Sequence, residues 1–164
     1  MADTPTVAFR SIRPDDEPFL YRVYASTREE ELRPVDWTPA QKAAFLLQQF
    51  QAQHAFYQEQ YARARFEVIL RDGEPIGRLY VDRRDDEVRI VDIALLPEHR
   101  STGIGSGILR SLLAEAAGAG KPVRVHVERL NPARRLYDRL GFVPIEDKGV
   151  YWLLEWRPPP EEIR

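Results

Sequence analysis

The sequence predicts an α/β fold in which helices pack on a sheet. An apolar segment, Val88–Leu96, is followed by the glycine-rich loop Arg100–Gly107 and then by apolar residues at helical spacing. This pattern predicts a strand, a loop and a helix. Earlier in the chain, Asp72 and Gly73 separate two strand-like segments, which is typical of a β-hairpin.

A strand and a helix are expected at the start of the chain. Val7–Arg13 alternates apolar and polar residues, as a half-buried strand does. Asp15 and Asp16 offer an N-cap for the first helix, with Pro18 in its first turn. The charged segment Arg28–Arg33 and the proline after it are expected to end this helix.

A long second helix and a hairpin should follow. Asp36 or Thr38 caps the helix, and Pro39 is its first residue. Its apolar and aromatic residues recur at near-helical spacing: Leu46, Phe50, His54, Tyr57 and Tyr61. The strands of the hairpin are expected at Phe66–Leu70 and Ile76–Asp82.

The second half of the chain supplies the remaining elements. Apolar residues at i, i+3, i+4 and i+7 predict a third helix: Leu109, Leu112, Leu113 and Ala116. Further strands are expected at Val123–Glu128, Phe142–Ile145 and Val150–Trp156, with a short helix before the second of them. Pro158–Pro160 ends the sheet and leaves residues 157–164 as an extended tail. We see no repeat and no linker, so we expect one domain over residues 1–164.

The composition excludes several classes of protein. The chain of 164 residues is 43% hydrophobic, which is enough for a substantial core in one domain. A net charge of −2 provides no basic field for nucleic acid. The chain has no cysteine, so disulfides, thiolate metal sites and a cysteine nucleophile are excluded. Its histidines, His54, His99 and His126, lack the spacing of a zinc site, and we expect no metal.

Membrane attachment is also not expected. No segment approaches the roughly 20 apolar residues that a membrane helix needs. The first residues lack the apolar region of a signal peptide. We therefore expect a cytoplasmic protein.

The loop Arg100–Gly107, with the sequence RSTGIGSG, has the chemistry of a phosphate-binding site. Gly103, Gly105 and Gly107 remove side chains where the backbone must curl. Several free N–H groups at the start of the following helix can then point at one anion, which the helix dipole also favours. The expected ligand is a phosphate.

Two common phosphate loops do not fit this segment. A nucleotide P-loop needs a lysine after its last glycine, and no lysine lies between Lys42 and Lys121. The dinucleotide fingerprint G-x-G-x-x-G/A fails at its sixth position, which is Ile108 or Arg110 for the two possible starts. The pattern that remains is R-x-x-G-x-G.

This motif and its surroundings resemble the GNAT superfamily of acyl-CoA-dependent N-acetyltransferases. The segment IALLPEHRSTGIG has the family's strand end, proline and glycine loop. Downstream, VHVERLNPARRLYDRLGF is similar to the second signature: a strand, an asparagine, a short helix with a tyrosine, then Gly-Phe. The resemblance spans Val88–Phe142. It implies a mostly antiparallel central sheet of about seven strands, flanked by about four helices and splayed between the fourth and fifth strands.

The resemblance also implies acetyl-CoA as the acyl donor. The implied cofactor-binding residues are Ile93, Ala94, Leu95, Arg100, Ser101, Thr102, Gly103, Ile104, Gly105, Ser106, Asn131 and Tyr137. The family's usual donor to the thioester carbonyl is the N–H group at the position of Leu95. Arg100 has a plainer alternative as a surface arginine, and Asn131 has one as a helix N-cap.

Three residues are candidate catalytic groups. In the family, a tyrosine at the position of Tyr137 gives a proton to the departing thiolate; alternatively, it only fills an apolar helix stripe. Asp92 and His126 each interrupt an apolar strand and are candidate general bases. Their alternatives are a carboxylate paired with an arginine and a hydrogen-bonded core imidazole. Glu67 and Glu128 are further candidates.

The implied function is direct transfer of an acetyl group to a primary amine. The acceptor is a small molecule or a peptide, and acidic and aromatic residues of the first two helices would suit a cationic amine. These acidic residues are also explained as a solvated charge run. Three alternatives stay open: a catalytically silent CoA-binding module, a transferase of another acyl group, and a mononucleotide-binding domain. The sequence does not decide whether the chain forms a homodimer.

Overall fold

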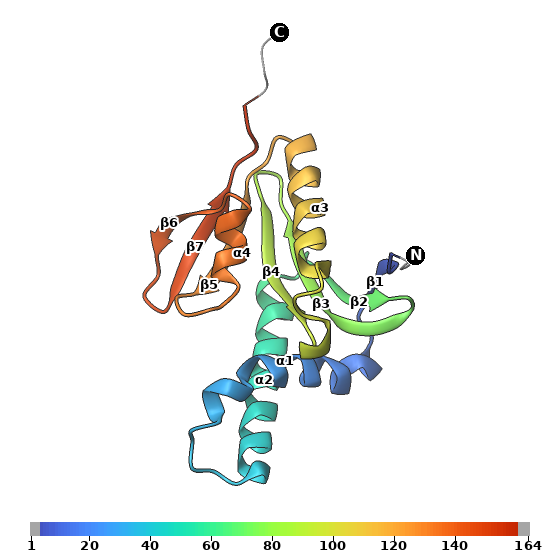
Figure 1. Cartoon of the computed structure of the whole chain (residues 1–164), viewed down its shortest axis with the longest axis vertical. Helices are drawn as coiled ribbons and strands as arrows, with labels where there is room; N and C mark the ends of the chain where they lie inside the picture. Colours follow the sequence, from blue (N-terminus) through green and yellow to red (C-terminus); the bar gives the residue numbers. More distant parts are fainter. Residues whose placement is uncertain (1–3, 161–164) are drawn as a thin grey trace. The chain divides into compact units, whose positions relative to one another are not determined.

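The chain folds as helices packed on a seven-stranded mixed sheet, as seen in a computed structural model that describes residues 4–160 (Figure 1). The strand order is β1-β2-β3-β4-β5-β7-β6. The strands are β1 (Val7–Ser11), β2 (Arg65–Arg71), β3 (Glu74–Arg83), β4 (Val88–Leu95), β5 (Val123–Glu128), β6 (Val143–Asp147) and β7 (Tyr151–Trp156). The helices are α1 (Glu17–Leu32), α2 (Pro39–Gln60), α3 (Ile104–Gly118) and α4 (Arg134–Arg139), with 3-10 turns at Pro14–Asp16 and Pro97–His99.

The strand pairing confirms the predicted mixed and mostly antiparallel sheet. β1 pairs with β2, and β7 with both β5 and β6, in antiparallel fashion. β4 and β5 are parallel, and Val88–Ile90 pairs with Val123–Val125. The splay between these two strands stays a prediction.

The chain forms two compact units, which we describe separately. The first unit contains residues 4–80 and 92–102, and the second contains residues 81–91 and 103–160, so β3 and β4 each contribute to both. This division into two compact units does not test whether residues 1–164 form one domain, which stays a prediction. In the predicted tail, residues 157–160 form neither helix nor strand, and residues 161–164 lie outside the described residues.

In the first unit, α1 and α2 pack against each other (Figure 1). Four buried residues form their shared core: Leu20, Tyr24, Leu46 and Phe50. The Tyr24 and Phe50 rings lie 6.0 Å apart. Thr38 caps α2 as predicted, because its side-chain oxygen accepts a hydrogen bond from the Gln41 N–H at 3.2 Å.

In the second unit, α3 buries the face that its spacing predicts. Leu109, Leu112, Leu113 and Ala116 are all buried. The helix packs on β5, whose alternate residues Val123, Val125 and Val127 are also buried. These two elements place the glycine-rich loop at the N-terminus of a helix that is anchored on the sheet.

The structure bears out part of what the sequence predicts for α1. The helix ends at Leu32, inside the charged segment Arg28–Arg33 and two residues before Pro34, as expected. Residues 28–32 are nevertheless helical, and an ion pair of 3.0 Å joins Arg28 to Glu31. Asp16 is the N-cap residue, but its side chain does not cap α1. Its carboxylate instead accepts two hydrogen bonds from the Arg10 guanidinium, at 2.7 and 2.8 Å.

Candidate functional site

The glycine-rich loop has the backbone geometry that an anion site needs. Gly103 is the N-cap of α3 and has φ +86°, a left-handed conformation that favours glycine. Among the described residues, no side chain caps this helix end. Because the first N–H groups of a helix have no partner within it, those of Ile104, Gly105 and Ser106 are available to a ligand. The predicted strand, loop and helix are therefore confirmed in order. The loop is shorter than predicted, because α3 begins at Ile104 and Gly105 and Gly107 are helical residues without a positive φ.

Arg100 is hydrogen-bonded to two other segments of the first unit. Its Nε donates to the Leu95 carbonyl oxygen at 3.0 Å, and its Nη2 donates to the Ser26 hydroxyl at 3.1 Å. The neighbouring loop residues Ser101 and Thr102 are exposed. The predicted contact between Arg100 and a pyrophosphate stays a prediction.

The end of β4 lies very close to β3. A Cβ atom built on Gly77 of β3 would lie 2.2 Å from the carbonyl oxygen of Ala94, so only glycine fits this position. Sequence reasoning missed Gly77. An isolated glycine within a strand pattern is a signal for such a close backbone approach.

Asp92 lies in a polar cluster that joins β3, β4 and α2. Its Oδ2 accepts hydrogen bonds from Arg78 Nη2 at 2.8 Å and from the Tyr57 hydroxyl at 3.2 Å. Arg78 also donates to the Gln53 side-chain oxygen at 2.9 Å. The expected alternative for Asp92, a carboxylate paired with an arginine, is therefore present. This pairing does not decide whether Asp92 also accepts a proton.

Arg78 is the cation of this cluster, and its exposed fraction is 2%. Burial is the strongest influence on its pKa and lowers it. The charges of Asp92, Tyr80 and Tyr57, and the hydrogen bond to Asp92, together outweigh burial and raise the pKa of Arg78 above its usual value. Sequence reasoning missed Arg78 and Gln53. An arginine inside the apolar segment Ile76–Val81 was the available signal, because a buried charge needs a partner.

His126 lies on β5 in the second unit, where its side chain is exposed. It is therefore not the core imidazole that was its alternative. Partial burial, then the positive charges of Arg89 and Lys148, lower the pKa of His126 below its usual value. At neutral pH the imidazole is neutral and has a lone pair to accept a proton.

The two glutamates are also on strands. Glu67 lies on β2 opposite Ser11 of β1, and Glu128 ends β5 opposite Tyr151. These positions do not favour either glutamate over Asp92 or His126 as the general base.

Tyr137 faces the interior of the second unit, as its helix stripe predicts. Its exposed fraction is 4%, and its ring packs edge-on against Phe142 with centroids 5.2 Å apart. Asn131 is exposed, and its side-chain oxygen accepts a hydrogen bond from the Ala133 N–H at 2.8 Å. Asn131 therefore caps the turn before α4, whereas the N-cap residue of α4 itself is Ala133, so the alternative of a helix N-cap is wrong.

The β5–α4 loop, which contains Asn131, is held by a neighbouring hairpin. Arg129 pairs with Asp147, donates to the Gly149 carbonyl and lies 4.3 Å from the Trp152 ring centroid. These contacts fix the loop against the turn between β6 and β7. Asn131 and Tyr137 consequently follow a restrained segment.

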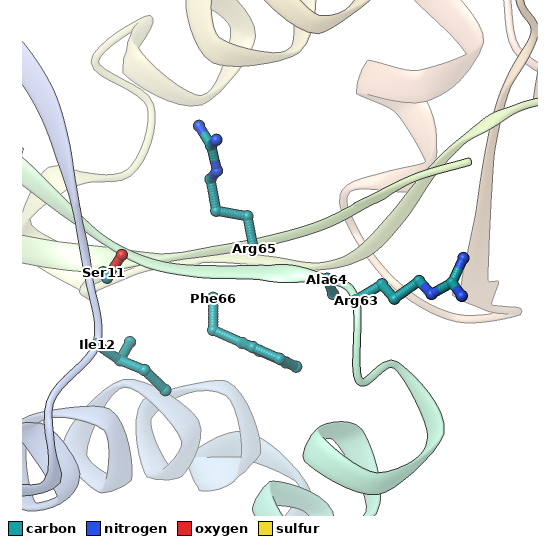
Figure 2. A pocket seen from close by; sticks show the side chains of 6 residues that line it. All are labelled: Ser11, Ile12, Arg63, Ala64, Arg65 and Phe66. Carbon is teal, nitrogen blue, oxygen red and sulfur yellow. The ribbon is translucent and has the colours of Figure 1, made fainter. Parts of the chain in front are cut away.

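The first unit has a pocket that is separate from the predicted site. It has a volume of about 350 Å³ and is lined by Ser11, Ile12, Arg63, Ala64, Arg65 and Phe66. Figure 2 shows the Arg63 and Arg65 side chains extending in different directions, so they do not converge on one anion. None of the predicted site residues lines it.

Residues 4–160 contain neither a candidate metal centre nor a helix suited to span a membrane. Within this part of the chain, no group of three or more His, Cys, Asp or Glu side chains is placed to hold a metal ion. None of the helices described is both long enough and apolar enough to cross a bilayer.

Comparison with known proteins identifies the family. The model of the acetyltransferase (GNAT) family matches residues 16–142, which is more than half of the chain. The chain belongs to this family. The match includes both GNAT signatures, the glycine-rich loop and the segment that contains Asn131 and Tyr137.

Solved GNAT structures show the same fold. The PaiA N-acetyltransferase from Thermoplasma acidophilum, in complex with coenzyme A, is 15% identical with a TM-score of 0.69, covering 93% of this chain and 99% of its own. A structure from Corynebacterium glutamicum, described as "histone acetyltransferase HPA2 and related acetyltransferase", is 24% identical with a TM-score of 0.62. The match covers 98% of this chain and 99% of that one. Arabidopsis thaliana Naa50, in complex with the bisubstrate analogue CoA-Ac-MVNAL, is 15% identical with a TM-score of 0.58, covering 92% and 97%.

Proposed function

We propose that this protein is an N-acetyltransferase that transfers the acetyl group of acetyl-CoA to a primary amine. The observation that carries the proposal is the left-handed Gly103, which opens an α3 N-terminus without a side-chain cap among the described residues, in a chain of the GNAT family. The proposed cofactor contacts are the main-chain groups of Ile93–Leu95, the loop Arg100–Ser106, and Asn131. Complexes with coenzyme A and a CoA-peptide analogue in other GNAT proteins support this choice of ligand.

The proposed reaction is a direct transfer. The amine nitrogen attacks the thioester carbonyl carbon, a C–N bond forms, and the C–S bond breaks. One proton leaves the amine and one joins the departing sulfur, so the products are an acetamide and free CoA. The Leu95 N–H stabilises the charge that develops on the carbonyl oxygen, and Tyr137 gives a proton to the sulfur.

We propose two candidates for the base that receives the amine proton. His126 is favoured by its lowered pKa, because it is neutral at physiological pH. Asp92 is favoured by its position just before the cofactor-binding end of β4, although Arg78 and Tyr57 already occupy its Oδ2. A lysine-like amine, with a pKa near 10.4, needs such a group at neutral pH.

The proposed acceptor is a small-molecule or peptide amine. We also propose that residues 1–164 act as one acetyltransferase domain. A catalytically silent CoA-binding module is the second candidate function, since Arg100 and Asp92 are both held by structural hydrogen bonds.

A thiol-release screen tests the proposal. The protein is incubated with acetyl-CoA and a panel of small amines, amino acids and peptides, and free CoA is measured with a thiol reagent. We expect at least one amine to raise thiol release well above the rate without an acceptor. Tight binding of acetyl-CoA without release for any amine would favour the silent module. Propionyl-CoA in a parallel series tests the acyl group.

A further inference from the structure

The peptide group between Ala94 and Leu95 packs directly against the backbone of β3 at Gly77. A Cβ atom on Gly77 would lie 2.2 Å from the Ala94 carbonyl oxygen, 2.9 Å from Leu95 Cδ2 and 3.1 Å from Leu95 Cα. Gly77 does not have a positive φ. Glycine is therefore required at this position because of the close approach and not because of the backbone conformation. Any side chain at position 77 must displace the end of β4.

A second contact holds the other side of the same segment. Arg100 Nε donates to the Leu95 carbonyl at 3.0 Å, and Arg100 Nη2 reaches Ser26 of α1 at 3.1 Å. The guanidinium therefore ties the Leu95 carbonyl to α1. Because guanidinium donors have a fixed planar geometry, this arrangement fixes direction as well as distance.

These contacts determine where the Leu95 N–H points. The next residue, Leu96, donates its N–H to the Ile76 carbonyl at 2.8 Å, towards β3. In an extended strand, the N–H and C=O of one residue point to the same side, and successive residues alternate. The Leu95 N–H therefore points away from β3, to the side from which Arg100 binds the Leu95 carbonyl.

We propose that Gly77 and Arg100 are positioning residues that aim the Leu95 N–H at the thioester carbonyl oxygen of acetyl-CoA. This inference rests on the proposed function, in which that N–H stabilises the developing oxyanion. Such a donor acts at about 2.7–3.1 Å from the oxyanion and gains its effect from being held in place beforehand. A displacement of about 1 Å can reduce the rate about a hundredfold.

Two variants separate this role from cofactor binding. Gly77→Ala displaces the Ala94–Leu95 peptide, and Arg100→Lys keeps the positive charge but loses the planar pair of donors. Gly118→Ala and Arg110→Lys are matched controls. Apart from the neighbouring backbone of α3, a Cβ at Gly118 meets no described atom within 4 Å, and Arg110 is exposed on α3. Each protein is examined for kcat, for the Kd of acetyl-CoA, and for the infrared carbonyl stretch of bound carbonyl-¹³C acetyl-CoA.

We expect the parent protein and both controls to lower the carbonyl stretching frequency when acetyl-CoA binds. Gly77→Ala and Arg100→Lys should lose most of this shift, and kcat should fall about tenfold to a hundredfold while the Kd changes less than about threefold. If Arg100→Lys instead weakens binding and leaves the shift and kcat unchanged, the Arg100 side chain is only a phosphate contact and its positioning role is wrong. The main chain of the loop stays the proposed cofactor contact in either case. Should Gly77→Ala fail to fold, Arg100→Lys alone decides.

The same measurements distinguish failure of the inference from failure of the proposed function. A parent protein that shifts the carbonyl stretch, with variants that shift it equally, overturns only the positioning role. A parent protein that binds acetyl-CoA without a shift, and releases no thiol with any amine, overturns the proposed function itself.

Discussion

Tyr137 is buried in α4, and its ring packs edge-on against Phe142. Packing alone therefore explains why an aromatic ring is present, and the hydroxyl is the part that tests the proposed acid. Tyr137→Phe keeps the ring and removes only this group. If the hydroxyl protonates the departing thiolate in a limiting step, kcat should fall about a hundredfold, with little change in the Kd of acetyl-CoA.

The control for this variant is Tyr151→Phe, because Tyr151 is an exposed tyrosine on β7. Both variants are assayed across pH with the acceptor found in the amine screen, since thiolate leaves more easily without help at high pH. If the Tyr137→Phe protein has the kcat of the parent protein throughout this pH range, the role of Tyr137 is packing and not catalysis. The proton then comes from water or from another group.

His126 gives a pH dependence of definite sign. Partial burial and the charges of Arg89 and Lys148 lower its pKa below 6.5, so it stays neutral to a lower pH than a free imidazole. If it is the base, kcat should reach a plateau at neutral pH and fall as the pH drops through the lowered pKa. His126→Gln should remove this fall of kcat at low pH and lower the plateau value of kcat. If the fall persists in His126→Gln, another group causes it, and Asp92→Asn is then tested.

At the scale of elements, regular spacing predicted the helices and strands well. The i, i+3, i+4 spacing of α3 and the alternation of β5 follow directly from which face is buried. The end of α1 at Leu32 lies within the predicted charged segment, although residues 28–32 are still helical. The side-chain cap expected from Asp16 is absent, because its carboxylate binds the Arg10 guanidinium. Local pattern does not show which partner a charged side chain finds.

The glycine-rich loop provides the prediction that belongs to this scale. A Cβ at Gly103 meets no atom of the described residues within 4 Å, so Gly103→Val is strained by its φ of +86° and not by crowding. We expect a modest fall in the melting temperature of the free protein, from a strain of about 1–3 kcal/mol. Binding of CoA should be abolished in a titration, because the backbone leaves the left-handed region.

Gly118→Val is the control for the loop variant. It adds the same side chain to α3 in open space at an ordinary φ, and it should bind CoA as the parent protein does. Normal CoA binding by Gly103→Val would show that the loop is not the phosphate site.

At the scale of the whole molecule, the sequence predicted local backbone structure better than it predicted which side chains meet. The R-x-x-G-x-G pattern predicted a glycine at an uncapped helix start, which α3 has among the described residues. That this helix start binds a phosphate stays a prediction. The partners of Asp92 and Arg100 come from α2, β3 and α1, far away in sequence. Such pairs depend on how strands and helices pack, which residue order alone does not specify.

Cofactor binding should stabilise the whole fold. A ligand that binds only the folded state adds RT ln(1 + [L]/Kd), about 2.7 kcal/mol at a hundredfold excess over Kd. For a chain of this size, about 2–4 °C per kcal/mol is expected, so acetyl-CoA should raise the melting temperature by several degrees. Pantetheine without phosphates should raise it far less, because the proposed anion contacts are the N–H groups of Ile104–Ser106 at the start of α3. Equal shifts from the two ligands would contradict the phosphate-loop assignment, and a shift with ATP but none with acetyl-CoA would favour a mononucleotide-binding domain.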